Sequence, residues 1–310
     1  MLYVTGITGH TGRWFLKKLQ SEKYLGKIRC VMRESRENAP EKYKVFDDCS
    51  LDLDFSVGRL EDKDFLMESL TDVTTIIHIA GISLSSEVVE AAIKNNVNWA
   101  ILVHTTGRFS KYKSASEEYI KIEDDILERC SAMPEGNRIL NCTILRPTMI
   151  YGSSGDRNIY RLVEYLDKHK VFPLFGDGSN LMHPVNARDL GIAYYDVLAH
   201  PSSTMNKEYD LSGKEPLAYL DIIKIIQGCL NKRAKIVKIP ISLSIFMAKV
   251  YNGVFKNALI TVEQVMRMQE DKAFSHEAAA RDFGYDPISF EDGIKEEVQE
   301  YLSGVRVDYK

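Results

Sequence analysis

Three glycines near the start of the sequence carry its clearest chemical signal. Gly6, Gly9 and Gly12 are spaced three residues apart in the run TGITGHTG at residues 5–12, between a β-branched segment and a helical pattern. Glycines in this position allow a tight turn and a close backbone approach to a pyrophosphate, at the positive end of the following helix. The run therefore predicts a dinucleotide site rather than a purely structural turn. The expected contacts come from Gly6, Thr8, Gly9, His10, Thr11 and Gly12.

The segment after the second predicted strand should distinguish NADP from NAD. An acidic residue there binds the 2′-hydroxyl of NAD, whereas arginines pair with the 2′-phosphate of NADP. The strand expected at residues 27–32 is followed by Arg33, Glu34 and Arg36. Because Arg33 comes first and Arg36 follows one short turn later, NADP is favoured and NAD is the alternative. A third interpretation is a solvated charged loop in which only Glu34, or neither type, touches the ligand.

Short β-branched runs alternate with helical patterns through the first half of the chain. Such alternation indicates right-handed βαβ crossovers and a parallel sheet with helices on both faces. After Gly152 the regularity fades, and from Gly213 the pattern is mostly helical, so a second region should pack on the first with a cleft between them. Strands are expected at residues 2–5, 27–32, 75–80, 100–105, 142–145 and 209–212, and helices at 13–20, 87–94, 117–130 and 188–198.

The composition narrows the class of function. The 310 residues are 45% apolar and 27% charged, which is typical of a globular protein. The net charge of −4 supplies no basic field that could hold nucleic acid by its phosphates. The seven histidines and the scattered acids show no metal-ligand spacing, so no metal site is expected. These features favour a small-molecule ligand and argue against nucleic acid as a partner.

The spacing of the cysteines and the hydropathy of the sequence indicate the cell compartment in which the protein is expected. The five cysteines are scattered without CxxC pairs, which is typical of reduced thiols in the cytosol. The chain opens without a charged leader, and its most apolar later stretch, residues 239–255, is interrupted by Lys249 and Asn252. That stretch is shorter than the roughly 20 apolar residues of a spanning helix. We therefore expect a cytoplasmic protein with no membrane partner, and a buried helix or helix pair there rather than interfacial membrane docking.

Further motifs follow the glycine turn in a recognisable order. They are HIAG at 78–81, VHTTG at 103–107, LRPTMIYG at 145–152, PVNARDL at 184–190, and GYDP with FEDG within 284–293. Together these motifs resemble the extended or atypical branch of the short-chain dehydrogenase/reductase superfamily, the NAD(P)-dependent epimerase/dehydratase-like proteins. The resemblance implies further cofactor contacts from Ala80, Gly81, Thr105, Pro147 and Met149.

The same resemblance implies an α/β fold with a Rossmann-type doubly wound parallel sheet. Residues 1–152 and 183–212 would form the NAD(P)-binding domain. Residues 153–182 and 213–310 would form a smaller, mostly helical substrate-binding region.

The catalytic motif of the family is incomplete in this sequence. Its redox members use Tyr-x-x-x-Lys, and the tyrosine position falls on Tyr119, but Glu123 stands where the lysine belongs. Lys121 lies about 200° round the helix from Tyr119, so it is a poor substitute. Tyr112 is a second candidate, yet Ser116 follows it at the lysine position.

The missing lysine changes the roles expected of the neighbouring side chains. A free tyrosine has a pKa of about 10 and a nearby carboxylate raises it further, so Tyr119 should act as a proton or hydrogen-bond donor beside the nicotinamide, unless it packs in the core. Glu123 could be the base if it faces the nicotinamide; otherwise it is a solvated helix residue. Thr106 stands where the family's serine holds a substrate oxygen, with Thr105 as the adjacent alternative.

Two functions therefore remain open. The first is an NAD(P)-dependent oxidoreductase or epimerase/dehydratase-like enzyme that transfers a hydride on a small polar substrate, by family analogy a nucleotide-linked sugar. The second is a catalytically inactive NADP(H)-binding regulatory or assembly module, which the absent lysine suggests. A homodimer is compatible with either function.

Overall fold

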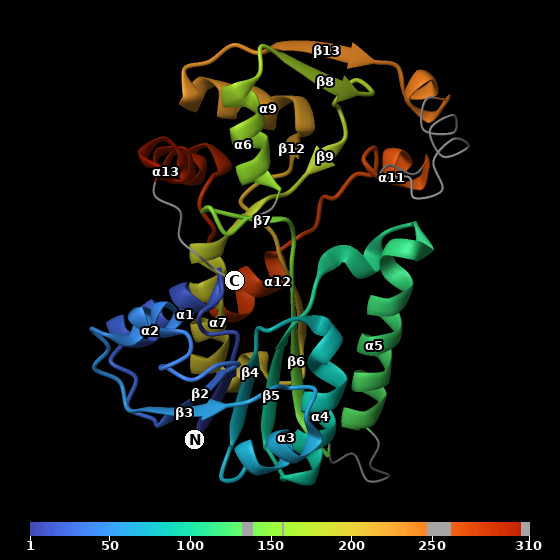
Figure 1. The fold of residues 1–310 in the computed structure, drawn as a ribbon. Helices are drawn as coiled ribbons and strands as arrows, with labels where there is room; N and C mark the ends of the chain where they lie inside the picture. The colour runs from blue at the N-terminus through green and yellow to red at the C-terminus, as the bar shows by residue number, and fades with distance from the viewer. Residues whose placement is uncertain (132–138, 157, 247–261, 305–310) are drawn as a thin grey trace.

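A seven-stranded parallel sheet forms the base of the molecule (Figure 1). The computed structural model describes residues 1–131, 139–156, 158–246 and 262–304. The strand order is β11-β6-β5-β4-β1-β2-β3, and every neighbouring pair is parallel. The strands are β1 (Leu2–Thr5), β2 (Ile28–Met32), β3 (Leu53–Val57), β4 (Thr75–His78), β5 (Trp99–Val103), β6 (Asn141–Pro147) and β11 (Glu208–Leu211).

The apolar strands form because both faces of the sheet are covered. Ile76 and Ile77 are adjacent in β4, so their side chains point to opposite faces, and both are fully buried in different cores. This doubly wound arrangement confirms the predicted Rossmann-type fold. The sequence analysis missed β3, which is an edge strand with partly exposed residues such as Phe55 and Val57.

Helices cover the sheet in two layers. On one face, α1 (Gly12–Ser21) and α7 (Ala187–Ala199) pack against each other and against the core that contains Ile77. On the other face lie α3 (Lys63–Ser69), α4 (Ser85–Lys94) and α5 (Lys113–Ser131). Shorter elements join the strands: α2 (Pro40–Tyr43), η1 (Lys44–Phe46), η2 (Ile82–Leu84), η3 (Thr106–Phe109) and α8 (Pro201–Thr204).

A smaller region with its own apolar core sits beyond the carboxyl ends of the strands (Figure 1). It contains three two-stranded ladders besides its helices, so it has more strand than the sequence pattern predicts. Its elements are β7 (Ile150–Tyr151), α6 (Ile159–Lys168), β8 (Val171–Phe175), β9 (Leu181–Met182), β10 (Val185–Asn186), β12 (Leu217–Ala218), α9 (Tyr219–Leu230), β13 (Lys235–Ile239), α11 (Val262–Arg267) and α13 (Phe290–Ser303).

One helix of the C-terminal part belongs with the sheet. All of residues 213–310 are expected in the substrate region, but α12 (Glu277–Phe283) places Ala279 and Phe283 in the core beside α7. Within the described ranges, no helix combines the length and the apolarity that crossing a membrane requires. Most of the apolar stretch at 239–255, where the sequence predicts a buried helix or helix pair, lies outside the described residues.

Candidate functional site

The glycine turn lies where the strand order of the sheet reverses. It connects the carboxyl end of β1 to α1, and β1 stands between β2 and β4, which are reached by connections on opposite sides. Parallel sheets bind ligands at such a switch point. A cavity of about 610 Å³ opens there. Its lining is Thr5, Gly6, Thr8, Gly9, His10, Thr11, Val31, Met32, Arg33, Lys42, Gly58, Leu60, Glu61, Ile79, Ala80, Leu84 and Ile150.

Two of the glycines are required by the geometry of the turn. Gly6 has a φ of +71°, and a Cβ there would lie 2.9 Å from the backbone nitrogen of Ala80. A Cβ on Gly12 would lie 2.2 Å from the carbonyl oxygen of Gly6. Gly12 therefore does not line the cavity but allows α1 to begin directly on the turn. The strand–turn–helix context that a dinucleotide site needs is present.

The cations at the end of β2 are arranged differently from the sequence-based expectation. Arg33 lines the cavity, but Arg36 does not; its guanidinium pairs with Asp47 at 3.0 Å. Lys42, from α2, lines the cavity instead and pairs with the exposed Glu34 at 2.7 Å. The prediction of Arg36 at the ribose is therefore wrong for this structure. The sequence does not indicate Lys42, because its position beside the cavity depends on how the connection between β2 and β3 folds back.

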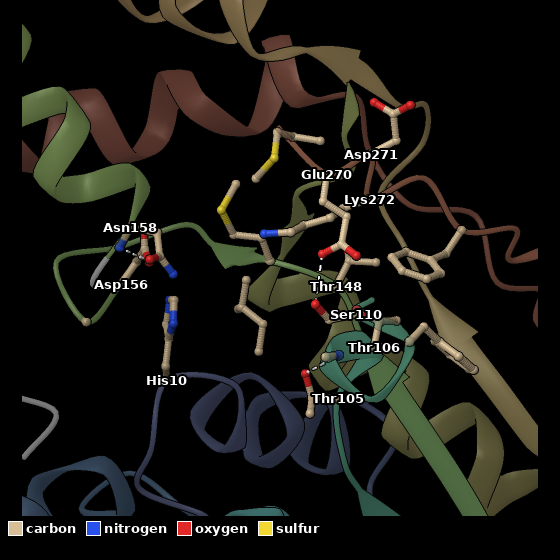
Figure 2. Close-up of a pocket in the computed structure, with 17 residues that line it drawn as sticks. His10, Thr105, Thr106, Ser110, Thr148, Asp156, Asn158, Glu270, Asp271 and Lys272 are labelled. Atoms are coloured by element: carbon tan, nitrogen blue, oxygen red, sulfur yellow. Dashed lines mark hydrogen bonds between the residues drawn. The ribbon is translucent and has the colours of Figure 1, made fainter. Parts of the chain in front are cut away.

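A second cavity of about 520 Å³ adjoins the first (Figure 2). His10 and Ile150 line both cavities, so the two spaces meet at the glycine turn. Most of the labelled side chains in Figure 2 are polar, and they come from both the sheet and the smaller region. The other lining residues are Thr105, Thr106, Gly107, Phe109, Ser110, Thr148, Met149, Gly155, Asp156, Asn158, Met182, Glu270, Asp271, Lys272 and Phe274.

Three residues predicted beside the nicotinamide line this second cavity. They are Thr105, Thr106 and Met149. The Thr106 hydroxyl donates to the carbonyl oxygen of Pro147 at 3.3 Å, so Pro147 supports the lining without being part of it. Gly81 also lies behind the lining, where its carbonyl oxygen contacts Nε2 of His78 at 2.9 Å.

Tyr119 lies outside the lining of both cavities. Its ring stands behind η3, where a Cβ added to Gly107 would be 3.1 Å from the ring carbon Cε2. No tyrosine of the described chain lines either cavity, and Tyr112 is no exception. The expectation that Tyr119 faces the nicotinamide is not met in this conformation, and packing against the η3 turn is its observed role.

Glu123 is the centre of a buried ion cluster. Its side chain is fully buried and accepts hydrogen bonds from Nδ1 of His104 at 2.8 Å and Nε of Arg146 at 2.9 Å, and it also pairs with Arg108. Burial alone would raise the pKa of Glu123, but the bonds from His104 and Arg146 and their charges outweigh it and lower this pKa to about 2. We call these four residues the Glu123 cluster. Glu123 is therefore neither a base facing the nicotinamide nor a solvated residue.

The Glu123 cluster includes an arrangement known from acyl-transfer enzymes. With Nδ1 of His104 bound to Glu123, its Nε2 is hydrogen-bonded to the hydroxyl of Ser85 at 3.1 Å. A Ser–His–acid series can activate a serine nucleophile. Here Ser85 and Glu123 have no exposed surface and neither cavity reaches them. The series therefore ties α4 and α5 to the segment that follows β5 instead of serving as a hydrolytic site.

Several polar residues of the second cavity were not found from the sequence. Glu270 is buried and its carboxylate accepts from the Ser110 hydroxyl at 2.9 Å and the Lys111 backbone N–H at 2.7 Å. Asp156 accepts from the backbone N–H of Asn158 at 2.8 Å. No local motif marks these residues, because the fold assembles them from segments up to 160 positions apart.

The chain is similar in sequence to one protein-family profile and to several curated proteins. The profile of the NAD dependent epimerase/dehydratase family matches residues 2–111. An Arabidopsis thaliana protein, NADH dehydrogenase [ubiquinone] 1 alpha subcomplex subunit 9, mitochondrial, is 22% identical over 79% of this chain and 61% of its own. Short-chain dehydrogenase/reductase family 42E member 1 of Bos taurus is 22% identical over 59% of this chain and 49% of its own. The chain thus spans about half to three-fifths of these relatives.

Solved structures share the fold over nearly the whole chain. The dTDP-glucose 4,6-dehydratase DesIV of Streptomyces venezuelae, solved with NAD, covers 97% of both chains with a TM-score of 0.72 and 18% identity. The UDP-glucuronic acid 4-epimerase of Bacillus cereus, solved with UDP-glucuronic acid and NAD, covers 98% of this chain and 99% of its own, with a TM-score of 0.72 and 16% identity. At such identities these matches show the fold alone. The profile match, the relatives and the shared fold all make the chain similar to the extended short-chain dehydrogenase/reductase-like proteins.

Proposed function

We propose that the chain binds a nicotinamide dinucleotide across its two adjoining cavities and acts as an oxidoreductase or epimerase/dehydratase-like enzyme on a small polar substrate. The observation that carries this proposal is the position of the glycine turn between the two cavities. The adenosine half would lie toward Arg33 and the pyrophosphate at the amino end of α1. The nicotinamide would then lie toward Thr105 and Met149. Solved structures of the same fold with NAD bound support a nicotinamide dinucleotide as the ligand.

For the cofactor, we propose NADP, with NAD as the alternative. Arg33 and Lys42 are two cations at the end of the cavity that would hold the ribose of the adenosine half. Both can pair with a 2′-phosphate. Glu34 is held by Lys42 on the exposed side, which makes it a weaker candidate for a 2′-hydroxyl.

For the reaction, a hydride would pass between the nicotinamide and a carbon that bears oxygen. Thr106 is the proposed holder of that oxygen because its hydroxyl lines the second cavity and needs to exchange only its bond to Pro147. A nucleotide-linked sugar is the proposed substrate class, since the similar structures include enzymes that act on such sugars. A cytoplasmic location and a homodimer stay predictions from the sequence.

One observation favours the second candidate function, dinucleotide binding without turnover. The tyrosine expected to transfer the proton is outside the cavity lining, and Glu123 at the lysine position is bound in its cluster. Such a protein would keep the binding energy of the cofactor but lack the acid/base pair. It would serve as an NADP(H)-responsive regulatory or assembly module.

Titration of the purified chain with NAD, NADH, NADP and NADPH, followed by calorimetry and nicotinamide fluorescence, tests the proposal. We expect saturable binding of at least one species, with NADP(H) tighter than NAD(H). Binding of none of the four by well-folded protein would overturn the function. Hydride exchange between the bound cofactor and an added sugar nucleotide would favour the enzyme. Tight binding with no exchange across a broad panel of carbonyl compounds and sugar nucleotides would favour the module.

A further inference from the structure

One wall of the second cavity is a segment of the C-terminal region that is fixed by hydrogen bonds. Asp271, Lys272 and Phe274 line the cavity from this segment. The backbone N–H of Lys272 donates to the carbonyl oxygen of Leu181 at 2.8 Å, and the N–H of Leu181 donates to the carboxylate of Asp271 at 2.8 Å. These two bonds run in opposite directions between β9 and the segment. The backbone at Lys272 is therefore held in place without a ligand.

The side chain of Lys272 extends from this wall into the cavity (Figure 2). It is the one lysine or arginine in the lining that the described residues form. Within the described part of the chain, no carboxylate forms an ion pair with its ammonium. Burial lowers the pKa of Lys272, and the nearby charge of Arg267 lowers it further, while Glu270 opposes them. The Lys272 ammonium is therefore partly removed from water, and no ion pair in the described chain offsets this loss of hydration.

The carboxylates that share the cavity are bound elsewhere. Glu270 accepts from Ser110 and from the Lys111 backbone, and Asp271 accepts from the backbone of Leu181. Asp156 accepts two backbone N–H groups at the start of α6. Each acid thus stabilises a wall of the cavity, and the positive charge of Lys272 is left to face its interior.

We propose that Lys272 binds an anionic group, a carboxylate or a phosphate, on the substrate that enters the second cavity. The inference rests on the proposed function only in taking this cavity as the substrate site. An ammonium offers three donors to anionic oxygens, and such charge-assisted bonds strengthen where water is excluded. A lysine that only covered apolar surface would direct its ammonium to the solvent. Lys272 instead lines the same space as the hydroxyls of Thr106 and Ser110.

The test uses three sugars built on the same ring: neutral glucose, glucuronate with a carboxylate at C6, and glucose 1-phosphate with a phosphate at O1. Their binding to the intact chain, saturated with the dinucleotide that it binds best, is followed by saturation-transfer NMR at constant ionic strength. The variants are Lys272→Met, which removes the charge, and Lys272→Arg, which keeps it. The matched control is Lys170→Met, at an exposed lysine away from both cavities.

We expect the wild type to bind at least one anionic sugar more tightly than glucose. The anionic sugar with the higher affinity shows whether the site prefers a carboxylate or a phosphate. Lys272→Met should weaken that sugar about tenfold or more, whereas Lys272→Arg should retain it within about threefold. Neither variant nor the Lys170→Met control should change the dinucleotide affinity.

Three results would overturn the inference. They are equal binding of charged and neutral sugars by the wild type, undiminished anion binding by Lys272→Met, and equal losses for glucose and the anions, which would mean that the side chain only shapes the cavity. All three leave dinucleotide binding intact. A wild type that binds the anionic sugars but no dinucleotide would instead refute the proposed function and spare Lys272.

Discussion

The glycine turn and the Glu123 cluster border the same sheet and use polar groups in opposite ways. At the turn the polar groups belong to the backbone, and they line a cavity because glycines keep side chains out of the way. In the cluster the polar groups are side chains from η3, α5, β6 and the residue that follows β5, and they satisfy one another inside the protein. This difference explains why the glycine turn can accept a ligand, whereas the Glu123 cluster stabilises the fold.

The largest expected effect comes from breaking the cluster. Glu123→Gln should lower the free energy of unfolding at pH 7 by about 3–5 kcal/mol, because it removes the one fully buried carboxylate that pairs with Arg146 in the described structure and leaves this guanidinium only the more exposed Glu208 and Asp210. Dinucleotide binding by the folded fraction should persist, since Glu123 lines neither cavity. Denaturant unfolding and calorimetric titration measure the two quantities.

The pH dependence of the same variant gives the sign of the electrostatic effect. The pKa of Glu123 is lowered in the folded state to about 2, so its contribution is full above the pKa of the unfolded chain, about 4.3, and is lost as the pH falls toward about 2. The difference between wild type and Glu123→Gln should therefore shrink below about pH 5. Asp125→Asn, at an exposed pair with Arg129, is the control and should change little at any pH. A gap that stays constant down to pH 2 would mean that shape, not charge, is what Glu123 supplies.

The next effect comes from placing a methyl group in the turn. Gly12→Ala puts a Cβ 2.2 Å from the backbone oxygen of Gly6, and neither backbone can move without opening the turn. We expect a loss of about 1–3 kcal/mol in stability and at least a tenfold loss in dinucleotide affinity. Gly228→Ala in α9 is the matched control, because a Cβ there meets no atom within 4 Å. It should be neutral or slightly stabilising. Normal cofactor binding by Gly12→Ala would show that the turn is not what holds the diphosphate.

Smaller changes in cofactor affinity should distinguish the roles of the three cations Arg33, Arg36 and Lys42. Arg33→Ala and Lys42→Ala should each weaken NADP about five- to tenfold and leave NAD nearly unchanged, because only NADP carries the 2′-phosphate. Arg36→Ala is the control, since its guanidinium pairs with Asp47 outside the cavity. Competition titrations with both cofactors measure the ratio. If Arg36→Ala alone altered it, the position of the loop after β2 would differ in the bound protein.

The sheet and the turn could be predicted because their signals are local. Apolar β-branched runs such as residues 75–78 specify buried strands, and the spacing of Gly6 and Gly12 specifies the turn. The partners of Glu123 could not be predicted, because His104 reaches it from just beyond the end of β5 and Arg146 from β6. The same holds for the C-terminal wall of the second cavity, where no motif marks the lining residues.

Glu297 is a buried carboxylate that forms no ion pair with a cation in the described part of the chain, so it provides a contrast to Glu123. In α13 it is fully buried; its Oε2 accepts from the backbone N–H of Gly152 at 2.7 Å, and its Oε1 has no hydrogen-bond partner in the described structure. Burial raises its pKa well above the ordinary value, and the nearby Asp156 adds to this. A folded-state pKa that is raised for an acid costs stability as the pH climbs above the unfolded value.

Glu297→Gln keeps an acceptor for Gly152 and removes the titration. We therefore expect a gain of up to about 1 kcal/mol at pH 8 and no change near pH 4, together with a flatter stability profile between these values. Glu296→Gln, at an exposed pair with Arg188, is the neighbouring control. Loss of stability on Glu297→Gln at pH 8 would show that the carboxylate is ionised and paired after all. Charge in this fold would then be tolerated inside the smaller region as it is in the Glu123 cluster.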